Sequence, residues 1–287
     1  MRAIVTGATN GIGEAIARRL AGAGITVVLV GRSDARLDAA RKRIDAEVPG
    51  ADLVTERADF ADLAQVRELA RRMLAGPAAD IVISNAAVVA PLERRTAEGR
   101  SRTLTVNHLA PYLLLRMLAE PARAARFVVV GADPRSLARA PVDLDDLDFT
   151  DPERLGEPVE LRPFRAYGRT KNMNAMFVYA LARRLDGSGI TVNGAHPGII
   201  AGTGLDGESP GIAEVVAAHY GLVDVDLPGP DVGADTPAWL ATAPEVAGVT
   251  GRFFVERQAV ATADHTTDVG RCDRLWNDSA RLTGLPV

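Results

Sequence analysis

The sequence predicts an α/β fold: a doubly wound, parallel, seven-stranded sheet with helices on both faces. Two observations predict it. Short apolar runs recur along the chain, and between them lie segments in which apolar residues recur every three or four positions. Most of the short runs are apolar throughout, as in strands that are covered on both faces. Strands and helices that alternate at this rhythm are typical of right-handed crossovers within one parallel sheet.

Seven runs are strand candidates. In chain order they cover residues 3–6, 26–30, 53–55, 80–84, 127–130, 190–193 and 252–255. The helical period is clear in segments 12–20, 63–73 and 104–118, which we expect to form amphipathic helices that pack on the sheet.

The length of 287 residues suits one large α/β domain or two small ones. Because no repeat or low-complexity linker divides the chain, we expect a single domain over residues 1–287. Two irregular segments, 133–165 and 202–233, are rich in Pro, Gly and acidic residues. Long loops in compact domains usually serve a function, so we expect these to form the walls and lid of a site at the carboxyl ends of the strands.

Composition argues against several classes of protein. The net charge is −4 and no basic stripe is present, so we expect no nucleic-acid partner. The single cysteine, Cys272, and four histidines without HxH or HxxxH spacing predict no metal site. No apolar run approaches the roughly 18 residues of a membrane span, and the first strand starts too early for a signal segment to precede it. We therefore expect a soluble, cytoplasmic protein.

The first strand is followed by Thr6-Gly-Ala-Thr-Asn-Gly-Ile-Gly13. Gly7, Gly11 and Gly13 allow a tight turn and a close approach of a ligand to the backbone. The helix that follows offers free N–H groups and the positive end of its dipole to a pyrophosphate. Three glycines alone are weak evidence, but their place between a strand and an amphipathic helix favours a Rossmann-type dinucleotide site.

The end of the second strand, Val30-Gly31-Arg32, bears on the choice of cofactor. NAD-binding proteins commonly place an acid here, which accepts a hydrogen bond from the ribose 2′-hydroxyl. Gly31 removes that acid, and the guanidinium of Arg32 can pair bidentately with a 2′-phosphate. An exposed turn arginine in an arginine-rich chain is the alternative. We predict NADP(H).

Tyr167 and Lys171 lie four residues apart on a predicted helix and so share a face. Lys171 is one of two lysines in a chain whose lysines and arginines total 33. A free phenol, with a pKa of about 10, exchanges protons poorly at neutral pH, and a nearby ammonium group favours the phenolate. The pair is thus a candidate acid/base site, in which Tyr167 gives a proton to a carbonyl oxygen or takes one from an alcohol. The alternative is an exposed pair on a polar helix face.

Together these features resemble the short-chain dehydrogenase/reductase family over essentially the whole chain. The motifs that carry the resemblance are the glycine turn at 6–13, Asp59, Asn85-Ala-Ala87, Asn107 in TVNHLAPYLL, Tyr167-x-x-x-Lys171, and His196-Pro-Gly-Ile-Ile200. Within the family, the stretches VDLDDLDF, HPGII and RLWNDSARLTG are similar to the retinol dehydrogenase and WW-domain oxidoreductase branch.

The resemblance implies roles for individual residues. Asn10, Ile12 and Gly13 are implied to line the pyrophosphate, and Asp59 and Phe60 to meet the adenine. Asn85 and Ala86 are implied to flank the adjacent ribose. The residues implied to lie beside the nicotinamide are Pro197, Gly198, Ile199 and Ile200. Tyr167 and Lys171 are implied to contact the cofactor as well, and Asn107 to hold a helix kink and a water near Lys171. Members of the family are usually homo-oligomers, so a dimer or tetramer is expected.

One position departs from the family pattern. The serine that normally follows the fifth strand and orients the substrate oxygen is replaced by Ala132, whose methyl group cannot donate a hydrogen bond. Losing one such donor costs on the order of 10²–10³ in rate. Three interpretations stay open: Ser136 reaches back, the substrate or another polar group takes over the orienting role, or the protein no longer performs redox chemistry.

The function predicted from the sequence is an NADP(H)-dependent oxidoreductase that interconverts a carbonyl and an alcohol on a medium-sized, mostly apolar small molecule. The alternative is an NADP-binding protein without net redox turnover, serving as a scaffold, a sensor or a catalyst of cyclisation or isomerisation. The composition, rich in Ala and Arg and poor in Lys, suggests a GC-rich bacterial genome, in which such ketoreductases often tailor secondary metabolites.

Overall fold

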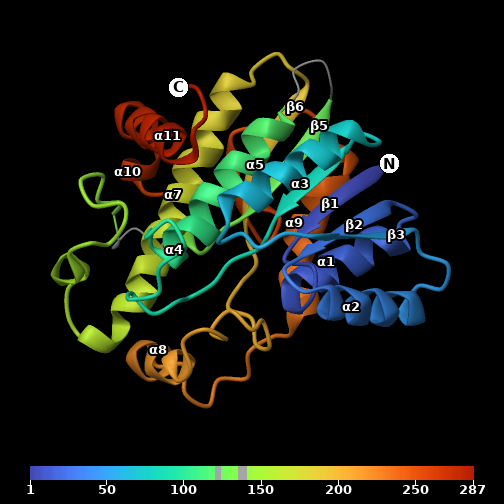
Figure 1. Cartoon of the computed structure of the whole chain (residues 1–287). Coiled ribbons are helices and arrows are strands. Elements are labelled where there is room, and N and C mark those ends of the chain that lie inside the picture. Colours follow the sequence, from blue (N-terminus) through green and yellow to red (C-terminus); the bar gives the residue numbers. More distant parts are fainter. Residues whose placement is uncertain (120–123, 135–140) are drawn as a thin grey trace.

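The computed structural model describes residues 1–119, 124–134 and 141–287. One mixed sheet runs through the molecule in the order β3-β2-β1-β4-β5-β6-β7-β8 (Figure 1). The strands are β1 Arg2–Thr6, β2 Thr26–Gly31, β3 Leu53–Arg57, β4 Ile81–Ser84, β5 Ala125–Val130, β6 Ile190–His196, β7 Arg252–Val255 and β8 Gln258–Val260. The order reverses between β1 and β4, and ligands of doubly wound sheets bind at such a switch point.

Helices cover both faces of the sheet and form two apolar cores. On one face lie α3 (Leu63–Ala75), α5 (Ala110–Leu118), α7 (Arg162–Arg184) and α11 (Val269–Thr283). On the other lie α1 (Gly11–Gly22), α2 (Asp34–Glu47) and α9 (Pro230–Thr242). Successive residues of β2 serve opposite cores: Val28 packs with the first group and Leu29 with the second. This explains why the strand is apolar throughout.

Shorter elements complete the described chain. They are α4 Arg102–Leu104, the π-helical turn η1 Thr105–Leu109, the 3-10 turns η2 Pro152–Leu155, η3 Val159–Leu161 and η4 Pro244–Val246, and the helices α8 Ile212–Tyr220 and α10 Asp264–Thr267. The predicted helix over 104–118 therefore exists, but it contains one π turn at the position of Asn107.

The expected seven strands were one too few. The eighth strand, β8, pairs antiparallel with β7, so that Phe253 lies opposite Val260. The two residues of the connecting turn, Glu256 and Arg257, have φ of 49° and 61°. A two-residue hairpin turn with both φ values positive normally contains Asn or Gly, and the sequence offers neither. The α/β fold with a mostly parallel sheet was predicted correctly.

The two segments expected to be irregular are partly helical. In the second, α8 occupies Ile212–Tyr220 and lies apart from both helical layers (Figure 1), and α9 already begins at Pro230. The first ends within α7, which begins at Arg162. Both α7 and α9 carry a proline in their first turn, where its missing N–H costs no hydrogen bond.

The described residues contain neither a membrane-spanning helix nor a cluster of metal-binding side chains. No helix in this part of the chain is both long and apolar enough to cross a membrane. In the same residues, no group of three or more His, Cys, Asp or Glu side chains is placed to hold a metal ion.

Candidate active site

A cavity of about 1620 Å³ opens at the carboxyl ends of the central strands. Most of the residues predicted for the site line it: Gly7, Asn10, Ile12, Gly13, Arg32, Asp59, Phe60, Asn85, Ala86, Tyr167, Lys171, Pro197, Gly198, Ile199 and Ile200. Parts of both predicted walls line it too, including Leu155 from the first and Glu208 from the second. The volume exceeds the 300–1,000 Å³ or so of an ordinary ligand pocket, which suits a dinucleotide together with a second molecule.

The glycine turn has the backbone that its sequence predicts. Gly7 and Gly11 have φ of +67° and +55°, in the left-handed region that favours glycine. A Cβ on Gly13 would lie 2.2 Å from the carbonyl oxygen of Gly7, so no side chain fits there. The N-cap residue of α1, Asn10, makes no side-chain hydrogen bond to the first turn of the helix. The N–H groups of that turn are therefore available to an anionic ligand, as a pyrophosphate requires.

Gly11 does not line the cavity, and its role is to allow a close contact. A Cβ at Gly11 would lie 2.9 Å from the Cα atom of Thr203, in the segment that follows β6. The Nδ2 atom of Asn10 also donates a hydrogen bond to the carbonyl oxygen of Thr203, at 3.4 Å. The glycine turn and the start of the predicted lid are thus in direct contact.

Asn85 lines the cavity and also holds the glycine turn in place. Its Nδ2 atom donates to the carbonyl oxygen of Thr6 at 3.0 Å, and its backbone N–H donates to the Thr6 hydroxyl at 2.9 Å. Asn85 therefore fixes the backbone at the end of β1 while it also faces the cavity.

Tyr167 and Lys171 both lie on α7 and both line the cavity. The Nζ atom of Lys171 lies 5.4 Å from the centre of the Tyr167 ring. It donates a hydrogen bond to the carbonyl oxygen of Val130, at 3.0 Å. Burial lowers the pKa of Lys171 to about 8 and raises the pKa of Tyr167. We expected the ammonium group to lower the phenol pKa; in the structure the ammonium is directed at a backbone carbonyl, and desolvation of the phenol outweighs it.

Asn107 lies behind the cavity rather than in its lining. Its side-chain oxygen accepts a hydrogen bond from the N–H of Val88 at 2.8 Å, and its Nδ2 atom donates to the Val88 carbonyl oxygen at 2.9 Å. Nδ2 also donates to the hydroxyl of Thr170 at 3.1 Å, and that hydroxyl donates to the carbonyl oxygen of Tyr167 at 2.7 Å. Asn107 therefore positions the segment after β4 and the turn of α7 that carries Tyr167 and Lys171.

Comparisons with known proteins agree with this geometry. The family model for short chain dehydrogenases matches residues 1–131. A Streptomyces protein named "Putative daunorubicin C-13 ketoreductase DnrU" is 35% identical over 98% of this chain and 92% of its own length. The chain belongs to the short-chain dehydrogenase/reductase family. Human retinol dehydrogenase 13 is 31% identical over 98% of this chain and 84% of its own length. The predicted family and its retinol dehydrogenase branch are confirmed.

Among solved structures, one from Beutenbergia cavernae superposes with a TM-score of 0.66, covering 88% of this chain and 94% of its own. It is 25% identical and is described as a "putative NAD(P) dependent gluconate 5-dehydrogenase" with bound NADP at low occupancy. This likeness confirms the Rossmann-like fold of the family in this chain.

Ala132 lines the cavity two residues beyond the end of β5, where the family pattern led us to expect a serine. The preceding residue, Gly131, is packed so closely that a Cβ there would lie 2.7 Å from the ring of Phe253. Ser136, the residue considered as a substitute, lies outside the described residues.

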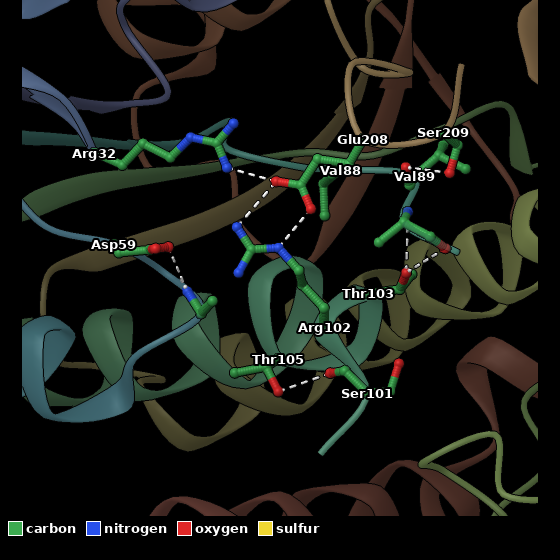
Figure 2. A network of polar contacts seen from close by, with 12 residues as sticks. Arg32, Asp59, Val88, Val89, Ser101, Arg102, Thr103, Thr105, Glu208 and Ser209 are labelled. Atoms are coloured by element: carbon green, nitrogen blue, oxygen red, sulfur yellow. Dashed lines mark hydrogen bonds and ion pairs between the residues drawn. The ribbon is translucent and has the colours of Figure 1, made fainter. Parts of the chain in front are cut away.

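The far end of the cavity contains Arg32, Asp59 and Phe60, as predicted, and two residues that were not predicted. Arg32 and Arg102 both form ion pairs with Glu208 (Figure 2). Glu208 is 176 residues from Arg32 and 106 from Arg102 along the chain. No local pattern in the sequence signals a contact at such separations, so neither Arg102 nor Glu208 was a candidate.

Proposed function

We propose that this protein is an NADP(H)-dependent oxidoreductase that interconverts a carbonyl and an alcohol on a medium-sized, mostly apolar small molecule. The observation that carries the proposal is that Tyr167, Lys171 and the glycine turn line one cavity at the switch point of the sheet. A proton donor and a dinucleotide cradle in one space are what carbonyl reduction by a nicotinamide requires.

NADP(H) is preferred over NAD(H) because of the end of β2. Gly31 leaves no acid there, and a Cβ at this position would already lie 2.6 Å from the Thr9 side chain. Arg32 follows directly and lines the cavity. The relative from Beutenbergia cavernae, whose structure contains NADP, supports the same choice.

The bound nicotinamide would supply or accept the hydride, and the residues of this chain would handle the proton. In the reductive direction, the buried phenol of Tyr167 is fully protonated and donates its proton to the carbonyl oxygen. Lys171, whose pKa of about 8 leaves it mostly charged at neutral pH, stabilises the phenolate that results. Exclusion of water by the buried surroundings strengthens the attraction between this ammonium group and the phenolate.

Part of the cavity lining next to Tyr167 is apolar and aromatic. Phe164 stacks on Tyr167 with ring centres 5.6 Å apart, and Tyr220 of α8 lies 6.1 Å from Phe164. Val216 and Leu222 add apolar surface to the same lining. This wall supports an apolar substrate, as do the names of two relatives, a ketoreductase and a retinol dehydrogenase.

One observation favours a second function: Ala132 lines the cavity at the position where a serine was expected. We infer that its methyl group takes the place of the serine hydroxyl, so the cavity loses a donor to the substrate oxygen. In this alternative the protein binds NADP(H) without net redox turnover.

The two functions are separated by measuring NADPH oxidation with a panel of aldehydes, ketones and quinones, alongside saturable NADPH binding. Substrate-dependent oxidation that is lost in Tyr167→Phe supports the oxidoreductase. The matched control is Tyr179→Phe, which removes a hydroxyl from the same helix, where it pairs with Thr262 away from the cavity lining, and is expected to retain activity. Tight NADPH binding with no consumption across the panel would establish the alternative instead.

A further inference from the structure

Two arginines from distant parts of the chain converge on one carboxylate. The NH1 atom of Arg32 lies 2.5 Å from Oε1 of Glu208. Arg102 binds the same carboxylate with two nitrogens, Nε at 2.5 Å from Oε2 and NH2 at 2.9 Å from Oε1. Figure 2 shows the carboxylate held between the two guanidinium groups. All three residues line the cavity, at the end that also contains Asp59.

This arrangement is a partly buried anion site. The side chains of Glu208 and Arg102 are only 12% and 14% exposed, whereas that of Arg32 is 49% exposed. Desolvation alone would raise the pKa of Glu208, but its hydrogen bonds to Arg102 and Arg32 outweigh that and the pKa is lowered. The hydrogen bonds that Arg102 donates to the Glu208 carboxylate raise the pKa of Arg102. The site therefore holds two positive charges around the Glu208 carboxylate, and the carboxylate of Asp59 is close enough to act on Arg102 as well.

We propose that Arg32 and Arg102 together form a clamp for the 2′-phosphate of NADP(H), and that the Glu208 carboxylate competes with this phosphate for the two guanidinium groups. The inference rests on the proposed function, because it takes Arg32 to be the residue that recognises the 2′ position. A phosphate has three free oxygens, enough to accept the paired bond from Arg102 and a further bond from Arg32. Its charge of nearly −2 also attracts the two guanidinium groups more strongly than a single carboxylate does.

Glu208 thereby affects the choice between the two nicotinamide cofactors. With its carboxylate in place, an incoming phosphate meets a like charge, whereas the 2′-hydroxyl of NAD(H) has no charge to repel. Removing the carboxylate should favour NADP(H), and removing Arg102 should disfavour it. Arg102 and Glu208 are thus specificity-determining residues, one for and one against the phosphate.

For the phosphate to replace the Glu208 carboxylate between the two arginines, only the Glu208 side chain has to move. The segment that carries it is fixed to the chain after β4 by backbone atoms: the N–H of Val89 donates to the carbonyl oxygen of Leu205 at 3.0 Å. The hydroxyl of Ser209, adjacent to Glu208, donates to the carbonyl oxygen of Val89 at 3.0 Å. These bonds do not involve the carboxylate, so they can persist while it turns away.

The test measures binding rather than turnover. Dissociation constants of adenosine 2′,5′-bisphosphate and of adenosine 5′-monophosphate, which differ only in the 2′-phosphate, are measured by calorimetry for the full chain. The variants are Glu208→Gln, Arg102→Gln and the double variant. Asp206→Asn, two residues before Glu208, and the exposed Arg94→Gln are matched controls. Thermal melts confirm that each variant is folded.

For Glu208→Gln we expect the bisphosphate to bind on the order of fivefold more tightly, the scale of a partly exposed ion pair. For Arg102→Gln it should bind on the order of tenfold more weakly, the scale of a hydrogen bond to a charged group. The double variant should retain the loss caused by Arg102→Gln. The monophosphate should bind equally to all variants, and the controls should match the wild type with both ligands.

The clamp would be overturned if the substitutions changed the affinities for both nucleotides equally. It would also be overturned if neither substitution changed the affinity for the bisphosphate. The result for the wild type tests the proposed cofactor separately. If the wild type prefers the monophosphate but Glu208→Gln reverses the preference, the clamp stands and the proposed NADP(H) preference fails. If the wild type prefers the bisphosphate and Arg102→Gln leaves that preference unchanged, the clamp fails and the proposed cofactor stands.

Discussion

The Nζ atom of Lys171 donates a hydrogen bond to the carbonyl oxygen of Val130, at 3.0 Å, and so ties the middle of α7 to the last residue of β5. Only 3% of Lys171 is exposed. A compact ammonium on a flexible stem can reach a single carbonyl in such a space, whereas a planar guanidinium would bring further donors that need partners. This explains why a chain that otherwise favours arginine has a lysine here.

The first prediction concerns how stability depends on pH. Burial lowers the pKa of Lys171 in the folded protein to about 8. In the unfolded chain it lies near the ordinary value of about 10.4. Between these values the unfolded state binds more protons, so Lys171 makes stability rise with pH. Compared with Lys171→Met, the wild type should therefore gain up to a few kcal/mol as the pH rises from about 7 to about 9.5.

Urea unfolding of both proteins across that range provides the measurement. Loss of the bond to Val130 shifts the Lys171→Met curve by a constant, so only the difference in slope is informative. The range ends below the titration of tyrosine, because the raised pKa of Tyr167 reverses the trend at higher pH. Parallel curves for the two proteins would show that Lys171 titrates normally in the folded state.

The second prediction concerns Tyr167 as the proton donor. Tyr167→Phe removes the hydroxyl and keeps the ring that stacks on Phe164. We expect kcat to fall by roughly 10²–10⁴, the usual contribution of a general acid, with NADPH affinity nearly unchanged. Steady-state kinetics on a substrate from the panel, together with NADPH titration, test this. A variant that binds NADPH but keeps its full rate would remove Tyr167 from the mechanism.

The third prediction concerns the hydroxyl of Thr170, which connects Asn107 to the backbone of Tyr167. Thr170 is fully buried, so Thr170→Val leaves one N–H of Asn107 short of a partner at little cost in shape. The free energy of unfolding should fall by about 1–2 kcal/mol. A positioning role predicts that kcat falls as well, whereas a purely structural role leaves kcat unchanged in the folded fraction. Thr191→Val, at the half-buried start of β6, is the control and should alter neither quantity much.

The parts of the fold that were predictable are those with a local cause. Most of the seven parallel strands were visible as apolar runs because both of their faces are buried. The glycine turn was visible because Gly7, Gly11 and Gly13 are required by backbone geometry. Tyr167 and Lys171 were paired correctly because they lie one helical turn apart.

The features that were missed have non-local causes. The contact of Glu208 with Arg32 and Arg102 depends on how the segment after β6 crosses the cavity, and residue types alone do not encode that path. The direction of the Lys171 side chain was missed for the same reason, since its partner Val130 is 41 residues away. Strand β8 was missed because its turn uses residues that disfavour the required backbone.

That turn gives the fourth prediction. Glu256, the first of its two central residues, has φ of 49°, a conformation that costs a non-glycine residue about 1 kcal/mol. Asn tolerates this region better, so Glu256→Asn should raise the free energy of unfolding by part of that amount. Arg257 is left unchanged because its Nε atom bonds Asp235 at 2.7 Å. Thermal unfolding measures the gain, and Gln258→Asn, in the adjacent strand, should instead be neutral or destabilising.

The last prediction concerns Ala132, which lines the same cavity as Tyr167. Ala132→Ser restores a hydroxyl at the end of β5, where it can donate to the oxygen that Tyr167 protonates. If this protein is an oxidoreductase weakened by the loss of that donor, kcat should rise, by at most the 10²–10³ or so that one such donor contributes. The gain must depend on the phenol, so the double variant Ala132→Ser/Tyr167→Phe should be as slow as Tyr167→Phe alone. An unchanged or lower rate in Ala132→Ser would mean that another group, or the substrate itself, already orients the reacting oxygen and that the added hydroxyl only occupies its space.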